Sequence, residues 1–209
     1  MTPSVDLYWL PLGAGGHFVA FNGRVYETIA AKREHRKQLD LYHTALIVTV
    51  SDGRFVIENA WPIPDGDGVA RGAVVEGPVG LPALGHLRVF RYEVRCWRDG
   101  TIADIREAVA SPQRISDDET TAHRVLDLVS SVPSLTWGRK PSDCDEMWNS
   151  NSVISWLLSR SGLNMHEIRP PTFGRAPGWA TGIALAGRSE ASALRSGREY
   201  PVRSAKEVT

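Results

Sequence analysis

The chain has 209 residues, of which 42% are hydrophobic and 23% charged, as in an ordinary globular domain. Lys and Arg total 24 and so do Asp and Glu, and this balance gives no sign of binding to nucleic acid or to a membrane surface. No apolar stretch is long enough for a membrane span, no secretory signal is evident, and Cys96 and Cys144 are too few for a disulfide scaffold or a four-thiolate zinc site. We therefore expect a cytoplasmic protein without a membrane span.

The N-terminal part predicts a short strand over residues 6–12, a glycine-rich turn over 13–16 and a helix over 23–38. The turn lacks the Lys-Ser/Thr of a phosphate-binding loop and the spacing of a dinucleotide fingerprint, so no cofactor is expected. The histidines show no metal-ligand spacing with one another or with the cysteines, so no metal site is expected either.

Asp52-Gly53 lies between two β-branched runs, residues 42–50 and 55–61, and predicts a β-hairpin. With Ser51 opposite Arg54, the pairing continues outward until Ile47 faces Glu58. Side chains alternate faces along a strand, so His43 and Glu58 are expected on one face of the hairpin. An imidazole and a carboxylate on one face suggest a general base and the group that orients it.

The remaining chain predicts an α+β fold, an antiparallel sheet packed against helices. Strands are expected at 73–76, 87–97 and 179–186, and a short helix at 102–110. A capping-box pattern, Ser116 to Glu119, introduces a helix over 117–131, and the strongest helical pattern covers 146–161 and ends at Gly162. Few apolar residues follow Gly187, so we expect a single domain over 1–186 and a flexible tail over 187–209.

Ser150 lies on the apolar seam of the 146–161 helix, between Met147 and Ile154. One interpretation is structural: Asn149 or Ser150 is the N-cap, or Ser150 bonds a carbonyl of the preceding turn. A second capping pattern from Asp143 to Glu146 would place Ser150 inside the helix. The other interpretation is chemical: a nucleophile at a helix N-terminus, activated by His43.

The order of a strand opening with His43, a polar Glu58 on the next strand, and a later helix beginning Asn149-Ser150-Asn151-Ser152 resembles the circularly permuted papain-like superfamily. That superfamily includes NlpC-type peptidases and amidases and the lecithin:retinol acyltransferase group. The resemblance covers residues 41–61 and 147–163 and implies a papain-like core in which His43, Glu58 and Ser150 form the catalytic set. The runs 41–46, 91–95, 147–152 and 174–179 also resemble uncharacterised actinobacterial proteins.

The sequence departs from that family at the nucleophile, because Ser150 stands where the family has cysteine. A hydroxyl needs a well-placed base during attack, whereas a thiol beside histidine ionises readily. Cys144 is an alternative thiol only if it lies in a loop before the helix, since six residues along a helix turn it about 120° away from Ser150.

Other residues are candidates for contacting a substrate. Trp148, Asn149 and Asn151 flank Ser150, while Trp61 and Arg175 belong to segments where tryptophan occurs beside glycine, proline or asparagine. Such clusters either frame a pocket or form packing corners.

Two functions follow from these patterns. The first is a hydrolase or an acyl or amide transferase, in which Ser150 attacks, His43 moves the proton and Glu58 orients the imidazole. The second is a catalytically inactive domain of the same fold that binds a small molecule, a peptide, a lipid or a protein partner through the former cleft. Nucleic acid is not expected as a partner.

Overall fold

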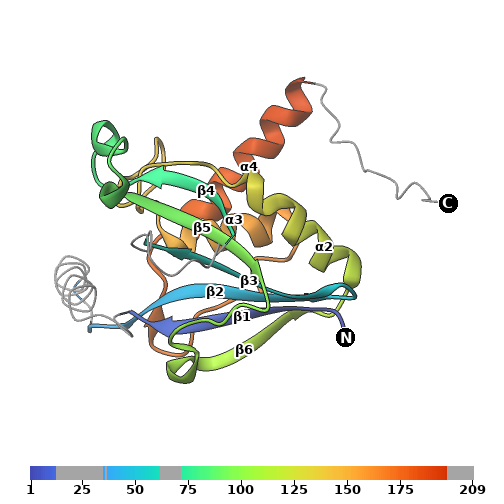
Figure 1. The fold of residues 1–209 in the computed structure, drawn as a ribbon. Helices are drawn as coiled ribbons and strands as arrows, with labels where there is room; N and C mark the ends of the chain where they lie inside the picture. Colours follow the sequence, from blue (N-terminus) through green and yellow to red (C-terminus); the bar gives the residue numbers. More distant parts are fainter. Residues whose placement is uncertain (13–34, 36, 62–71, 197–209) are drawn as a thin grey trace.

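The computed structural model describes residues 1–12, 35, 37–61 and 72–196 and shows an α+β fold, with one mixed but mainly antiparallel sheet (Figure 1). The strand order is β4-β5-β3-β2-β1-β6, and β7 adds a short parallel pair to β2. The strands are β1 Ser4–Pro11, β2 Asp40–Val50, β3 Gly53–Ala60, β4 Ala73–Pro78, β5 Arg91–Arg98, β6 Val109–Ser116 and β7 Gly174–Arg175.

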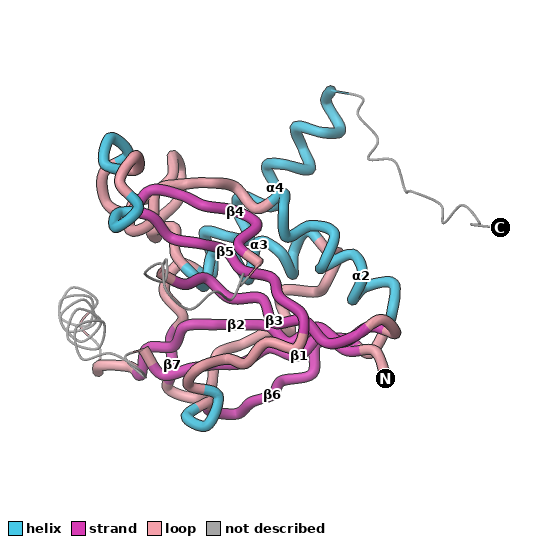
Figure 2. The backbone as a smooth tube through the Cα atoms, in the orientation of Figure 1, coloured by secondary structure: helices cyan, strands magenta, loops and turns pink. Residues whose placement is uncertain are grey.

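The helices of the described residues are α2 Glu119–Leu128, α3 Ser150–Arg160 and α4 Trp179–Ser196, with short 3-10 turns at Pro82–Leu84, Arg88–Phe90, Ile105–Glu107 and Val129–Ser131. All three α-helices lie on the same side of the sheet (Figures 1 and 2). None of the described helices has the length and apolar character needed to cross a bilayer.

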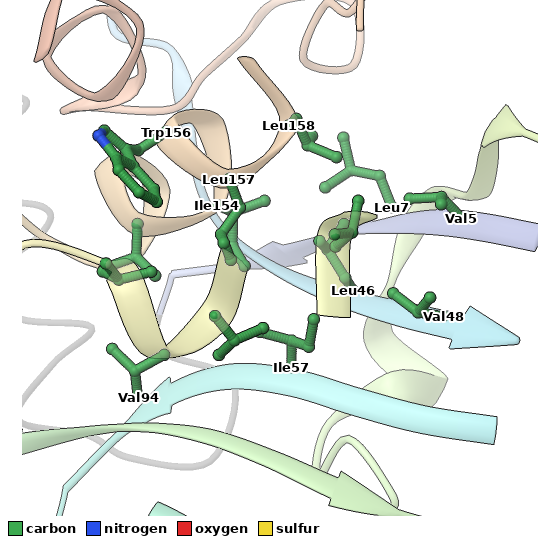
Figure 3. Packing of buried hydrophobic residues seen from close by; sticks show 14 of the residues in the cluster. Val5, Leu7, Leu46, Val48, Ile57, Val94, Ile154, Trp156, Leu157 and Leu158 are labelled. Atoms are coloured by element: carbon green, nitrogen blue, oxygen red, sulfur yellow. The ribbon is translucent and has the colours of Figure 1, made fainter. Parts of the chain in front are cut away.

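The main core lies between this side of the sheet and α3. Leu7, Leu46 and Ile57 from three neighbouring strands meet Ile154 and Leu157 of α3, and all five side chains are fully buried (Figure 3). Burying an aliphatic side chain of this size stabilises the fold by about 2 kcal/mol. We call this side of the sheet the helix face.

The opposite side carries a smaller cluster, which we call the second face. Ala45, Ile47 and Val56 pack there against Leu10 and Ile102. Residues 45 and 47 alternate with Leu46 along β2, so the two faces of one strand supply two separate apolar clusters. The 102–108 segment between β5 and β6 covers the second face.

The predicted hairpin is confirmed, with its register moved by two residues. Ile47 pairs with Val56 rather than with Glu58, and Val50 pairs with Gly53, so the turn residues are Ser51 and Asp52. A shift of two residues preserves the alternation of faces. Glu58 therefore remains on the same face as Val56, Ile47 and His43.

The prediction of a strand at 179–186 was wrong, because α4 runs from Trp179 to Ser196 and so continues past Gly187, where the tail was expected to begin. Glycines inside a helix are unfavourable and weakened the helical signal. Gly182 is needed for packing: a Cβ there would lie 2.1 Å from the Ser152 carbonyl oxygen, so glycine lets α4 cross close over α3. Residues 197–209 lie outside the described chain.

Two further predictions need correction. The short helix expected at 102–110 is only a 3-10 turn at Ile105–Glu107, and the next residues form the edge strand β6, which contains Pro112. An edge strand tolerates proline because one side of its backbone needs no partner, and this obscured the strand pattern. Strand β5 begins at Arg91, four residues later than predicted. The helix expected at 23–38 falls almost wholly outside the described residues.

Candidate binding site

The N-terminus of α3 is fixed by Asn149, which is its N-cap. The Asn149 side-chain oxygen accepts hydrogen bonds from the backbone N–H groups of Asn151 and Ser152 at 3.0 and 3.2 Å, and the Ser152 hydroxyl accepts from the Asn149 N–H at 3.2 Å. This is a reciprocal capping box. Of the alternatives that the sequence left open, the Asn149 cap is the one observed, and α3 starts at Ser150 rather than at residue 146.

Asn151 joins α3 to the sheet. Its amide nitrogen donates to the carbonyls of Tyr42 and Pro177, both at 2.9 Å, and its oxygen accepts from the Thr44 hydroxyl at 3.0 Å. The side chain is buried. Its amide thus connects β2, α3 and the loop before α4, so it has a structural role.

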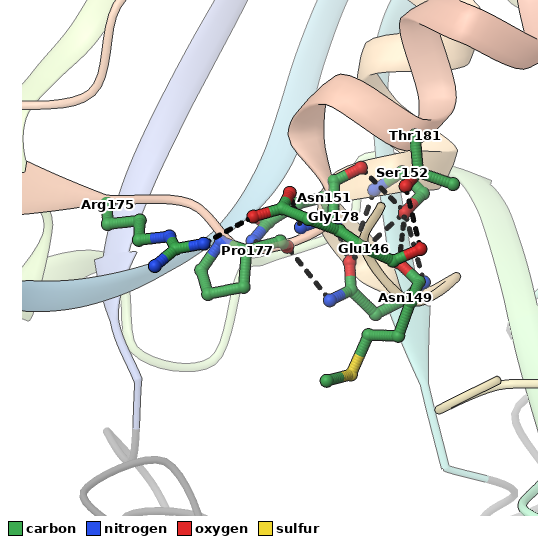
Figure 4. Close-up of polar contacts among 9 residues, drawn as sticks. Glu146, Asn149, Asn151, Ser152, Arg175, Pro177, Gly178 and Thr181 are labelled. Atoms are coloured by element: carbon green, nitrogen blue, oxygen red, sulfur yellow. Dashed lines mark hydrogen bonds and ion pairs between the residues drawn. The ribbon is translucent and has the colours of Figure 1, made fainter. Parts of the chain in front are cut away.

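The loop before α4 is held by a second set of contacts. Glu146 accepts hydrogen bonds from the Arg175 guanidinium and from the Gly178 N–H, both at 2.7 Å, and the Ser152 hydroxyl donates to the Gly178 carbonyl at 2.8 Å (Figure 4). Asn149 completes the set by donating to the Pro177 carbonyl at 2.9 Å. We call these residues with Asn151 and Thr181 the corner network.

The corner network uses three of the residues predicted to contact a substrate. Asn149, Asn151 and Arg175 all make internal hydrogen bonds, and the two asparagines are buried. A fourth predicted residue, Trp148, is 0% exposed and donates from its indole nitrogen to the Tyr92 hydroxyl at 3.1 Å. In this structure these four side chains support the fold around α3 rather than present a surface to a ligand.

Ser150 is the first residue of α3 and is 7% exposed. Its hydroxyl makes no hydrogen bond to any residue that the structure describes. Thr44, which faces α3, bonds Asn151 instead. No described imidazole or carboxylate is hydrogen-bonded to the hydroxyl to take its proton.

His43 lies on the second face, away from α3. It precedes Thr44, whose hydroxyl reaches Asn151 on the helix face, so alternation turns the imidazole to the other side of β2. Burial lowers the pKa of His43 from 6.5 to about 4, an effect that the nearby Asp104 carboxylate partly opposes. The structure does not bring Ser150 and His43 together, because the sheet lies between them.

Glu58 shares the second face with His43, as the hairpin pattern predicted. Its pairing position on β5 is Arg95, which is buried and forms an ion pair with Glu93 at 2.7 Å. The alternative nucleophile Cys144 lies in a loop before α3, where its N–H donates to the Pro141 carbonyl at 3.2 Å. The expected catalytic set is therefore divided between the two faces of the sheet.

A different group of side chains forms a pocket at the end of the helix face. Asn59, Ala60, Trp61, Tyr92 and Trp137 line a space of about 190 Å³ that opens to solvent. The Trp137 ring centroid lies 6.5 Å from that of Trp61 and 5.8 Å from that of Tyr92, with tilts of 47° and 48°. Trp61, the one predicted binding residue found here, is 52% exposed. We call this space the aromatic pocket.

The floor of the aromatic pocket contains a buried amide without a hydrogen-bond partner. Both the nitrogen and the oxygen of the Asn59 side chain are inaccessible to solvent, and neither is hydrogen-bonded to any residue that the structure describes. Buried amides are nearly always paired, because an unpaired one costs about 1–3 kcal/mol. The aromatic walls around it are fixed: Tyr92 donates to the Leu135 carbonyl at 2.9 Å, and Arg95 donates to the Trp61 carbonyl at 2.7 Å.

Only a weak signal for this pocket is present in the sequence. Asn59 follows Glu58 in the predicted strand, and Trp61 and Trp137 are far apart in the chain, so only the pairing of β3 with β5 brings them to one place.

Among the described residues, no group of three or more His, Cys, Asp and Glu side chains is placed to hold a metal ion.

Comparisons of the chain with protein-family models, with curated proteins and with solved structures gave no match.

Proposed function

We propose that this protein is a non-catalytic binding domain that takes a planar, amide-bearing group, such as one residue of a peptide, into the aromatic pocket. The observation that carries the proposal is the Asn59 amide, which is buried at the pocket without a partner. Because both atoms are closed off from solvent, a ligand amide would reach Asn59 only after the exposed Trp61 side chain moves aside, and it would then supply both the acceptor and the donor that Asn59 lacks.

The walls of the pocket suit such a group. Trp61, Tyr92 and Trp137 present aromatic surface, and an exposed tryptophan beside a concave site is a typical anchor in binding surfaces. The pocket is a shallow depression that is open to solvent, so it suits the edge of one ring or one side chain rather than a whole drug-sized molecule.

The location also supports binding over catalysis. Trp148, directly before the N-cap of α3, contacts the outer wall of the pocket through the Tyr92 hydroxyl. The pocket is thus next to the region where the resemblance to papain-like proteins implies a cleft. Ser150 and His43, which a hydrolase of that kind would need together, are on opposite sides of the sheet.

The proposal is tested by titrating the ¹⁵N-labelled protein with N-acetyl amino-acid amides that carry proline, leucine or tryptophan side chains. We expect shifts of the Asn59 side-chain amide and of the Trp61 and Trp137 indole signals. Trp61→Ala should weaken binding at least about tenfold, because it removes an aromatic anchor. Phe173→Ala removes an aromatic ring that is 80% exposed elsewhere and should leave binding unchanged.

Two results would overturn the proposal. One is a titration that shifts none of the three pocket signals with any of these amides. The other is covalent labelling of the native protein by a fluorophosphonate probe that is lost in Ser150→Ala, since this would show an activated serine.

A further inference from the structure

The connection between β4 and β5 exposes a cluster of apolar side chains. Leu81, Leu87, Val89 and Phe90 are all exposed, and Val89 reaches 72%. These residues lie in, or directly before, two short 3-10 turns at the end of the hairpin, which extends beyond the neighbouring strands (Figures 1 and 2). We call residues 81–90 the hairpin tip. Clustered apolar exposure of this kind marks an interaction surface.

The hairpin tip has a defined shape. The Val79 N–H donates to the Phe90 carbonyl at 2.8 Å, and the Phe90 N–H donates to the Leu87 carbonyl at 2.9 Å. Below it, the Gly80 N–H donates to the Trp137 carbonyl at 3.0 Å. The apolar side chains are therefore presented outward by a braced loop.

The ionisable side chains within the hairpin tip are basic, and the nearest acidic residue before it in the chain is Glu76. Residues 77–92 contain His86, Arg88 and Arg91 but no Asp or Glu. Arg91 is ion-paired with Glu76 at 2.7 Å. The neighbouring Arg139 donates to the Gly80 carbonyl at 2.6 Å and, like the adjacent Lys140, is exposed, which adds two positive charges at the base of the tip.

We propose that the hairpin tip docks onto an anionic phospholipid surface, with its apolar side chains among the upper acyl chains and its basic rim at the headgroups. Apolar side chains combined with cationic residues are the requirement for binding at a membrane interface, and each Lys or Arg near an anionic surface adds about 1 kcal/mol. A second copy of the chain fits this surface poorly, because two tips in contact would bring like charges together.

This inference does not depend on the function proposed for the aromatic pocket. The two features are connected through Trp137, which lines the pocket and accepts the hydrogen bond from Gly80. A protein docked by the hairpin tip would hold the pocket close to the bilayer surface.

The test is co-sedimentation of the full chain with phosphatidylcholine vesicles, with and without about one third phosphatidylserine. We expect binding to the anionic vesicles that weakens with added salt. Val89→Glu should reduce partitioning at least about tenfold, since it places a charge at the most exposed apolar position of the tip. Lys140→Gln should reduce it about fivefold, the effect of one lost cation.

Phe173→Glu is the matched control, because it makes the same kind of change at an apolar side chain with 80% exposure outside the tip and should leave partitioning unchanged. Circular dichroism and thermal unfolding check that each variant is folded. The proposal is overturned if neither vesicle sediments the protein, or if Val89→Glu binds as the native chain does. It is also overturned if ultracentrifugation shows an oligomer that Val89→Glu dissociates, which would identify the tip as a contact between copies.

Discussion

The two faces of the sheet accommodate buried polar side chains in different ways. On the helix face, Thr44 and Asn151 pair with each other and with backbone carbonyls. On the second face, His43 is kept neutral by burial, and Glu93 and Arg95 neutralise each other in an ion pair at 2.7 Å. Hydrogen bonds between neutral groups hold one face to its helix, whereas ionisable groups lie on the other.

This difference follows from the alternation of side chains along a strand, because a shift of one residue moves a side chain from one face of the sheet to the other. Thr44 and His43 are neighbours on β2, but only Thr44 faces α3. Had the alternation been displaced by one residue, the imidazole would face the N-terminus of α3 and Ser150. The observed arrangement leaves the helix face with neutral donors and acceptors suited to structure and binding, and places His43 beyond the reach of Ser150.

The largest expected effect comes from a substitution that breaks the contact between β2 and α3. Asn151→Ala removes three buried hydrogen bonds and leaves the Tyr42 and Pro177 carbonyls without that donor. We expect the free energy of unfolding to fall by about 4 kcal/mol, from roughly 1–1.5 kcal/mol for each buried bond lost. Urea denaturation followed by tryptophan fluorescence measures it.

Ser150→Ala is the control for Asn151→Ala. It changes the adjacent residue, whose hydroxyl makes no hydrogen bond with the described chain, and should alter stability by about 0.5 kcal/mol or less. Equal losses in the two variants would contradict a specific structural role for the Asn151 amide.

The next effect concerns the second face and appears as a pH dependence. The native state holds His43 with a pKa of about 4, whereas the unfolded chain has the ordinary value of 6.5. As pH falls below 6.5, the unfolded state takes up a proton first, so stability is lost progressively down to about pH 4. The loss from this group approaches about 3.5 kcal/mol at 1.4 kcal/mol for each pKa unit.

His43→Leu isolates this contribution from that of the carboxylates, since leucine does not titrate and suits the apolar surroundings of Ala45 and Ile47. The free energies of unfolding of native and variant protein are compared at pH 7 and pH 4.5. The variant should lose less stability between these two values. Parallel curves would mean that His43 titrates normally in the folded protein and is not desolvated.

Much of the fold could be predicted from the sequence, because local signals agree with the tertiary structure. The hairpin signalled by Asp52-Gly53 and the helix α2 follow from short-range chemistry, although the turn is at Ser51-Asp52 and the N-cap of α2 is Asp118 rather than Ser116. α4 could not be predicted, because a glycine at position 182 disfavours a helix when only the local sequence is considered. That glycine is required by the close packing of α4 on α3. Tertiary packing overrides intrinsic propensity there.

The candidate site was less predictable for the same reason. The sequence indicated that His43 and Glu58 share a face, which alternation determines, but it could not show which face α3 covers. Asn149 was recognised as a possible cap, and the structure uses it as one. The aromatic pocket depends on the pairing of β3 with β5 and on the return of Trp137 from a distant loop, and no local pattern encodes either contact.

The smallest expected effect is an increase in the free energy of unfolding, and it tests the contrast between Asn59 and Asn151. Asn59 differs from Asn151 in having a buried amide with no partner, so replacing it with the similarly sized, apolar leucine removes an unfavourable group. We expect Asn59→Leu to raise the free energy of unfolding by about 1 kcal/mol while abolishing the binding of N-acetyl amino-acid amides. Urea denaturation and the NMR titration measure the two quantities on the same sample. If Asn59→Leu instead lowers the free energy of unfolding, Asn59 has a structural role like that of Asn151.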